Sequence, residues 1–167
     1  MYENLKKREA STDCNWNWLG HFVTDFGGDS SKIYSRGWIN GYDYNEDDRI
    51  LTLYCETAWT ECNEWRHFII SKCEDLTISF IAEESGNDYY VTNIPDYEFP
   101  FVVETDDEHF DLRDASQVLA TVCEYSECEV PDCDDEFETA MRLADEYNEK
   151  HKDDDKYVFV NRYTYYD

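Results

Sequence analysis

The sequence has few basic residues: 14 Lys and Arg stand against 40 Asp and Glu, which gives a formal net charge of −26. Binding nucleic acid depends on Lys and Arg that contact phosphates, so this shortage excludes the chain as a nucleic-acid-binding protein. Only 3 Pro and 6 Gly occur in 167 residues, and no Pro/Gly/Ser-rich linker divides the chain. No run approaches the ~18 apolar residues of a membrane span. The sequence therefore predicts one soluble domain, made in the cytosol, that does not bind membranes.

Aromatic residues are abundant, at 17% of the chain, and apolar residues make up 41%. An acidic disordered tail carries far fewer of both, so the chain is expected to fold around a core. The acids are unevenly placed: residues 1–82 hold 14 acids and 8 bases, whereas residues 83–167 hold 26 acids and 6 bases. The C-terminal half therefore carries −20 of the net charge of −26.

Periodicity predicts the secondary structure of residues 49–167. Apolar residues that alternate with polar ones indicate strands, and apolar residues that recur every three or four positions indicate helices. Thr60 is a candidate N-cap for a helix with Cys62, Trp65, Ile69 and Cys73 on one face. The predicted order is a strand at 49–55, a helix at 60–73, strands at 76–80 and 89–91, helices beginning after the N-cap Asp114 and at Asp134, and a strand at 156–166.

Three further expectations concern the less regular parts of the chain. Residues 95–103 contain two prolines, which suits an edge strand or an extended segment. The N-terminal extension, residues 1–48, is expected to hold a short helix within 14–26 and a strand at 36–44. In the last helix the predicted buried side carries Phe137, Met141, Ala144 and Tyr147.

This order of elements is that of an α+β ferredoxin-like fold, an antiparallel sheet with helices packed on one face. Within residues 53–93, three groups stand out: Glu56, Thr57, Ala58 and Trp59 at a strand end, Glu83, Glu84 and Gly86 in a turn, and Tyr89 and Tyr90 in the next strand. With these residues the segment resembles the YubB-type ferredoxin-like domain of phage and plasmid proteins. The chain departs from that family at Thr60 to Cys62, where the family has Trp-Ser-Pro-Pro. The resemblance implies a fold and a mobile-element origin.

A second, shorter resemblance concerns the segment NIPDYEFPF, which includes Asp96 to Pro100. It is similar to a segment of the ArdA antirestriction proteins, which are acidic, of comparable length, and imitate bent DNA. What the two share is a physical character, a strongly acidic composition at a comparable length.

Motifs for enzymatic chemistry are missing: there is no phosphate-binding Gly-rich loop, no G-x-S-x-G and no H-E-x-x-H. We therefore expect no enzymatic activity, no cofactor and no metal. Seven cysteines, an odd number, are expected to be reduced thiols. Cys123, Cys128 and Cys133 lie five residues apart, wider than the usual spacing of zinc ligands, so free thiols are favoured and zinc is the alternative. The acidic runs 106–108 and 153–155 are interpreted as solvated loops, with Mg²⁺ or Ca²⁺ binding as the alternative.

The acidic surface is the candidate interaction site. A net charge of magnitude about 2 to 8 already keeps a small domain soluble, so −26 exceeds that need, although solubility and halophilic adaptation are alternatives. Duplex DNA carries one charge per ~1.7 Å, so about 20 charges correspond to roughly 34 Å of duplex. Carboxylates also pair with Arg in the bidentate manner of phosphates. The predicted partner-binding residues, called the acidic set below, are Asp106, Asp107, Glu108, Asp111, Glu127, Glu129, Asp132, Asp134, Asp135, Glu136 and Glu138.

The sequence thus predicts an acidic DNA-mimic inhibitor from a phage or mobile element, active in the host cytoplasm. It would block the basic nucleic-acid-binding cleft of a host CRISPR effector nuclease or restriction enzyme. Anti-CRISPR action is placed before antirestriction because an Arg pair that reads a PAM is an obvious target for clustered carboxylates. The alternatives are a metal- or thiol-dependent enzyme and a structural or adaptor protein of the mobile element.

Overall fold

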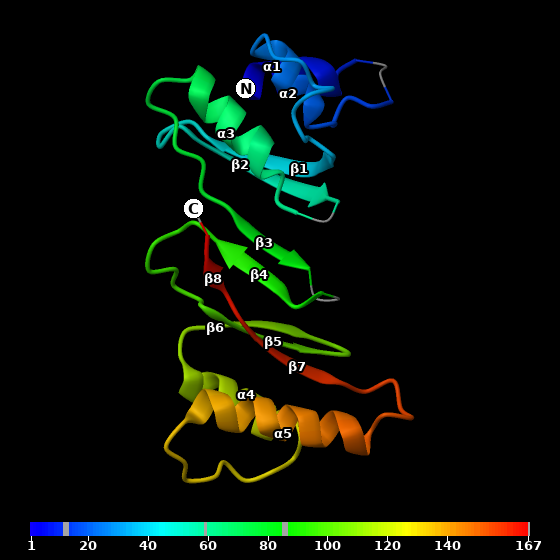
Figure 1. The fold of residues 1–167 in the computed structure, drawn as a ribbon, viewed down its shortest axis with the longest axis vertical. Coiled ribbons are helices and arrows are strands. Elements are labelled where there is room, and N and C mark those ends of the chain that lie inside the picture. The colour runs from blue at the N-terminus through cyan, green and yellow to red at the C-terminus, as the bar shows by residue number, and fades with distance from the viewer. Residues whose placement is uncertain (12–13, 59, 85–86, 167) are drawn as a thin grey trace. The chain divides into compact units, whose positions relative to one another are not determined.

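The computed structural model describes residues 1–11, 14–58, 60–84 and 87–166. Its internal contacts divide the chain into two compact parts, unit 1 (residues 1–78) and unit 2 (residues 79–167). Unit 1 contains α1 (Tyr2–Glu9), α2 (Gly20–Asp25), β1 (Gly37–Asn45), β2 (Ile50–Thr57) and α3 (Asn63–Lys72) (Figure 1). Unit 2 contains β3 (Ile81–Glu84), β4 (Tyr89–Thr92), β5 (Phe101–Thr105), β6 (His109–Leu112), α4 (Ala115–Tyr125), α5 (Glu136–Lys150), β7 (Val158–Arg162) and β8 (Thr164–Tyr165).

Unit 1 packs three helices against one β-hairpin. Strands β1 and β2 pair in antiparallel register from Gly37 opposite Thr57 to Asn45 opposite Ile50. One face of this hairpin meets the helices, since Ile39 of β1 is buried while its neighbours Trp38 and Asn40 are exposed. The buried core consists of Leu5, Leu19, Phe22, Val23, Ile39, Cys62, Trp65 and Ile69.

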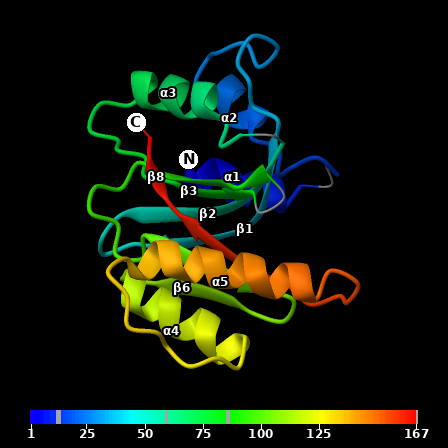
Figure 2. The same cartoon turned by 60° about the horizontal axis from the view of Figure 1, so that its bottom comes forward.

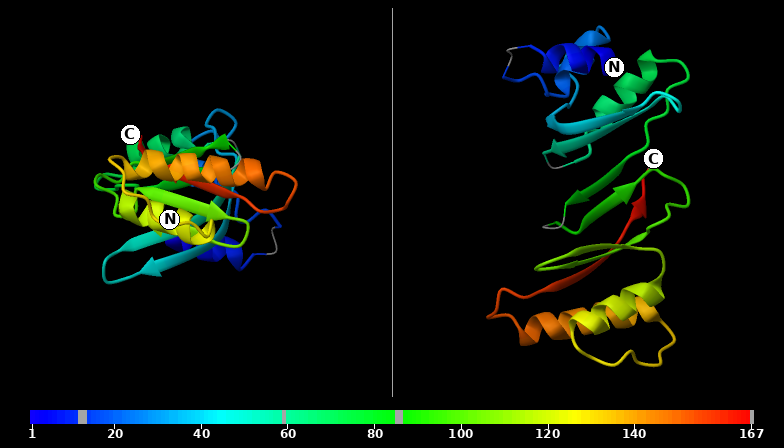
Figure 3. Two further views of the ribbon diagram at one scale, coloured as in Figure 1. Left: turned by 90° about the horizontal axis from the view of Figure 1, so that it is seen from below. Right: turned by 180° about the vertical axis from the view of Figure 1, so that it is seen from behind.

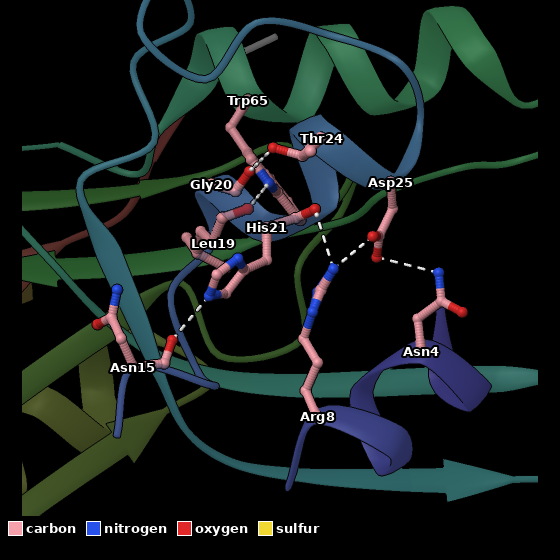
Figure 4. Close-up of polar contacts among 9 residues, drawn as sticks. All are labelled: Asn4, Arg8, Asn15, Leu19, Gly20, His21, Thr24, Asp25 and Trp65. Atoms are coloured by element: carbon pink, nitrogen blue, oxygen red, sulfur yellow. Dashed lines mark hydrogen bonds and ion pairs between the residues drawn. The ribbon is translucent and has the colours of Figure 1, made fainter. Parts of the chain in front are cut away.

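Hydrogen bonds and an ion pair connect the helices of unit 1 to one another (Figure 4). Arg8 of α1 forms an ion pair with Asp25 of α2, and Asn4 Nδ2 donates a hydrogen bond to the second oxygen of the same carboxylate at 3.0 Å. The indole Nε1 of Trp65 in α3 donates to the carbonyl of Leu19 at 3.0 Å. Helix α2 therefore holds both of its neighbours through directional bonds as well as through the core.

Unit 2 contains two three-stranded sheets, with strand orders β6-β5-β7 and β3-β4-β8. Both neighbours of β5 are antiparallel to it, whereas β4 pairs antiparallel with β3 and parallel with β8. Strands β7 and β8 are separated by Tyr163, whose N–H donates to the carbonyl of Pro100 at 2.9 Å. The last segment of the chain, red in Figure 1, therefore passes from one sheet to the other.

Helices α4 and α5 cover one face of the β6-β5-β7 sheet (Figure 2). The carboxylates of Asp114 and Asp135 cap them, accepting from the backbone N–H of Gln117 and Glu138 at 2.9 Å in each case. On the other face, Val102 packs with Tyr90, Tyr97 and Tyr163. The buried core under the helices consists of Val103, Val118, Leu119, Val122, Cys123, Ala140, Ala144 and Val158.

The α+β class predicted from the sequence is confirmed, with five helices and three small sheets in the described residues. The single antiparallel sheet of a ferredoxin-like fold is not found, because the strands divide into sheets of two, three and three. Residues 1–48, predicted as an extension, supply α1, α2 and β1 to the core of unit 1, and the division of the chain into compact units falls after residue 78. Helix α1 was not predicted, because its sole buried residue, Leu5, leaves no apolar periodicity to detect.

Several elements lie where the sequence predicts them and others are displaced. Helices α4 and α5 and strands β1, β2, β4 and β7 match their predicted ranges to within a few residues. Residues 76–80 form no strand in the structure: the backbone N–H of Phe80 donates instead to the Asn93 side chain at 2.8 Å, and regular pairing begins at Ile81. The N-cap of α3 is Cys62, two residues after the predicted Thr60.

Two predictions are corrected. Residues 95–103 were expected to form an edge strand or an extended segment, but residues 101–103 belong to β5, the central strand of its sheet. Pro100 lies just outside that strand, where its missing N–H costs no ladder hydrogen bond. Met141 is 38% exposed, because the packed side of α5 runs through Ala140 and Ala144.

None of the helices in the described residues combines the length and apolar character needed to cross a membrane.

Candidate functional site

All eleven residues of the acidic set belong to unit 2 and are exposed. Asp106, Asp107 and Glu108 form the turn between β5 and β6. This turn is pinned by Thr105, whose Oγ1 accepts hydrogen bonds from the backbone N–H of Asp107 at 3.3 Å and of Glu108 at 2.9 Å, while the Thr105 N–H donates to the Glu108 carbonyl at 2.8 Å. The turn therefore presents its carboxylates on a fixed backbone.

The end of α4 is attached to this turn. The hydroxyl of Tyr125 donates a hydrogen bond to the Asp106 carboxylate, and the rings of Tyr125 and Tyr147 meet edge to face at 5.2 Å. Burial, and then the hydrogen bond to Asp106, raise the pKa of the Tyr125 hydroxyl above its ordinary value. The hydroxyl consequently stays protonated and keeps donating to Asp106 over the neutral range.

Asp135, Glu136 and Glu138 lie at the opposite end of the helices from the turn, because α4 and α5 run parallel. Phe137 at the start of α5 contacts Phe101 at 5.1 Å, next to the start of α4, while Tyr147 near its end contacts Tyr125 near the end of α4. The connection between the helices must therefore run back along them, as the right-hand view of Figure 3 shows. This connection carries Glu127, Glu129, Asp132 and Asp134. After it, the start of α5 places Asp135, Glu136 and Glu138 at the opposite end of the helical layer.

The structure therefore places the acidic set along the helical layer and one end of its sheet, rather than in one compact cluster. Asp111 is the exception. Its neighbours on β6, Phe110 and Leu112, pack against the core under the helices, so Asp111 and His109 point to the other face of the sheet.

A second acidic loop adjoins the turn. Tyr157 lines a shallow hollow together with residues 104–109, and it also lines a second hollow formed by residues in 148–159, including Asp154 and Asp155. Residues 153–155 are exposed, as expected of a solvated loop. This loop adds carboxylates to the end of unit 2 that carries Asp106 to Glu108.

On the face of the sheet away from the helices, His109 lies between two carboxylates. Its Nδ1 is 3.3 Å from Glu104 Oε1, and its Nε2 is 3.4 Å from Asp111 Oδ1. Glu83 of β3 completes the group, which we call the His109 cluster: Glu83, Glu104, His109 and Asp111. Among the residues that the structure describes, Glu83, Glu104 and His109 are the one trio of potential metal ligands whose ligand atoms all lie within 4.8 Å of one another.

Burial raises the pKa of the Glu83 carboxyl above its ordinary value; the charges of Asp111 and Glu104 act in the same direction, and His109 opposes them. The hydroxyl of Tyr163, a residue that is 7% exposed, donates a hydrogen bond to Glu83. This hydrogen bond from the buried Tyr163 fixes one oxygen of the Glu83 carboxylate.

In the described part of the chain, no cysteine belongs to a group of three or more potential metal ligands that lie close together. Cys123 is buried under the helices, Cys133 is half-buried, and Cys128 is exposed. Burial, followed by the contact with Cys128, raises the pKa of the Cys123 thiol to about 11. All seven cysteines are free in the structure, which agrees with the sequence-based interpretation of reduced thiols.

The sequence matches no known protein-family model, and neither a curated protein nor a solved structure is significantly similar to it. Trp59 and Gly86, which contribute to the YubB-type resemblance, lie outside the described residues.

Sequence reasoning located the exposed acids and missed the His109 cluster. His109 and Asp111 are two residues apart on a strand, a spacing that places both on one face. That signal exists in the sequence, but Glu83 lies 26 residues before His109 and on another sheet. Only the pairing of β5 with β6, which sets Glu104 opposite His109, and the packing of the two sheets of unit 2 bring the group together.

Proposed function

We propose that this protein is an acidic inhibitor that occupies the nucleic-acid-binding cleft of a host defence nuclease by imitating DNA. The observation that carries the proposal is that unit 2, with 26 acids and 6 bases, presents all eleven members of the acidic set on its surface. A basic cleft built for phosphates accepts carboxylates because both anions pair with the guanidinium group of Arg through two parallel hydrogen bonds.

Rigidity supports this proposal, because a mimic must hold its charges in place before it binds. The turn at Asp106 to Glu108 is fixed by Thr105 and Tyr125, and the start of α5 is capped by Asp135. Carboxylates on such elements lose little conformational freedom on binding, whereas those of a disordered acidic tail would have to be ordered at a cost in affinity. Opposite net charges also accelerate association at low salt.

The target that we favour is a CRISPR effector nuclease, followed by a restriction enzyme, and the site of action is the cytoplasm of the host. We also propose that the chain originates from a phage or mobile element. The resemblance of residues 53–93 to the YubB-type ferredoxin-like domain supports that origin, and the acidic character shared with ArdA proteins supports the mode of action.

The test compares two sets of four substitutions that each reduce the net charge from −26 to −22. The interface set, Asp107→Asn, Glu108→Gln, Glu136→Gln and Glu138→Gln, changes exposed members of the acidic set and leaves the cap Asp135 and the Tyr125 partner Asp106 intact. The control set, Glu46→Gln, Glu56→Gln, Glu74→Gln and Asp75→Asn, changes exposed acids of unit 1. Each protein is assayed for inhibition of a panel of CRISPR effectors and restriction enzymes.

We expect the interface set to weaken inhibition by roughly tenfold or more, equivalent to about 1.4 kcal/mol, and the control set to leave it nearly unchanged. Duplex DNA should displace the inhibitor from the captured enzyme, and inhibition should weaken as salt rises. Binding that survives high salt and excess duplex would show an adaptor or another inhibitory mechanism, and the mimicry proposal would be wrong.

A further inference from the structure

The His109 cluster has the dimensions of a metal site. Zinc lies 2.0–2.2 Å from nitrogen and oxygen ligands, so neighbouring ligand atoms in a tetrahedral site are about 3.3–3.6 Å apart. The separation of His109 Nδ1 and Glu104 Oε1 is 3.3 Å. One ligand atom from each of Glu83, Glu104 and His109 lies within 4.8 Å of the other two, so a small side-chain movement would place three ligands around one ion.

Asp111 supplies the outer partner that metal-binding histidines use. A ligating imidazole commonly donates its second ring N–H to a carboxylate, which fixes the tautomer and the ring orientation. Asp111 Oδ1 lies 3.4 Å from Nε2 of His109, on the opposite side of the ring from Glu104. This arrangement leaves Nδ1, the atom that faces Glu104, to act as the metal ligand.

Carboxylates outnumber basic groups within the His109 cluster. Three carboxylates surround one imidazole, and His109 is the one group in the cluster able to carry a positive charge. Glu104 is half-buried, with a side chain 15% exposed, so its charge is not fully compensated by water. A divalent ion would offset this repulsion.

We propose that Glu83, Glu104 and His109 bind one divalent transition-metal ion of the zinc class, and that Asp111 orients His109. The imidazole ligand selects this class, because Mg²⁺ and Ca²⁺ prefer sites made of oxygen atoms alone. The ion joins β3 of one sheet to β5 and β6 of the other, so it ties the two sheets of unit 2 together. This inference is independent of the proposed DNA mimicry.

Cobalt is the probe, because Co²⁺ substitutes for zinc and gives a visible spectrum that reports its ligands. The full-length protein is stripped of metal with a chelator and titrated with Co²⁺, and zinc is then used to displace it. We expect one Co²⁺ per chain without the thiolate-to-cobalt charge-transfer absorption that cysteine ligands produce. His109→Asn and Glu104→Gln should each weaken binding by at least about tenfold, and Asp111→Asn by about 10–100-fold.

His151→Asn is the matched control, because His151 Nδ1 also contacts an aspartate, Asp154, at 2.9 Å in the same unit. This variant should bind Co²⁺ as the wild type does. Circular dichroism confirms that each variant is folded, and Glu83→Gln gives a second measure that leaves the β5–β6 hairpin untouched. The proposal is overturned if His109→Asn binds as tightly as the wild type, if a thiolate band dominates the spectrum, or if Mg²⁺ competes as well as Zn²⁺.

Discussion

At the scale of single residues, several acids have structural roles besides carrying charge. Asp135 caps α5, Asp106 accepts a hydrogen bond from Tyr125, and Asp111 contacts His109. These three carboxylates carry the same charge as the others in the acidic set, but they differ in how far they are already bonded within the protein. Their bonds to the protein fix their positions but reduce what each has left for a partner's arginine, so the rest of the acidic set should contribute most of the binding energy.

Asn148 gives a prediction at this scale. Its side chain bonds to both peptide groups of Val158, donating to the carbonyl and accepting from the N–H, each at 2.8 Å. Asn148→Ala removes both bonds and leaves a buried strand residue without these partners, so we expect a loss of about 1–3 kcal/mol in the free energy of unfolding. Denaturant unfolding measures this loss. Asn148→Asp keeps the acceptor but sets a carboxylate oxygen against the Val158 carbonyl, so it should also be less stable than the wild type. Equal stability of all three proteins would contradict the bidentate role.

At the scale of elements, helices with a wide apolar face are held by core packing, whereas α1 is held mainly by polar and aromatic contacts of its side chains. Its one buried residue is Leu5, and its other attachments are polar or aromatic. Arg8 and Asn4 bond to Asp25 of α2, Glu9 accepts a hydrogen bond from Tyr42 at 2.5 Å, and the ring of Tyr2 stacks on that of Tyr44 at 4.3 Å. Removing a single partner should therefore loosen this helix more than the others.

Asp25→Ala tests this dependence. Arg8 and Asp25 are 23% and 16% exposed at their side chains, and hydrogen bonds to charged groups contribute about 1.5–3 kcal/mol each, so amide exchange in residues 2–9 should accelerate markedly. Exchange in α3 should change little. Asp29→Ala is the control, since Asp29 pairs with Lys32 at 3.4 Å in an exposed position. Faster exchange throughout unit 1 in Asp25→Ala would instead indicate that α1 and the core unfold together.

At the scale of the whole molecule, charge opposes folding. A net charge of −26 on 167 residues produces self-repulsion, and unit 2 carries −20 of it. Exposed ion pairs such as Arg142 with Glu146 offset only a small part of this repulsion. The protein therefore keeps its acidic surface at a cost in stability, which favours a role for that surface in binding.

Salt should reveal this cost. Raising the ionic strength from about 0.01 M to 0.15 M shortens the Debye length from about 30 Å to 8 Å, so the midpoint of thermal unfolding should rise over this range and then level off. Circular dichroism at several NaCl concentrations measures the midpoint, and sucrose at matched osmolality is the control. A midpoint that keeps rising steeply into molar salt would favour halophilic adaptation over DNA mimicry.

The sequence by itself determined the net charge, its concentration in the C-terminal half, and the elements whose signals are local. Asp114 and the spacing of Val118, Leu119 and Val122 specify α4 without reference to any other segment. Strand partners carry no such signal, since alternation reports which face is buried and not which strand lies alongside. Tertiary structure alone decided that β8 pairs with β4, that the strands form three sheets, and that Glu83 meets His109. Those contacts join residues far apart in the chain, and packing selects them.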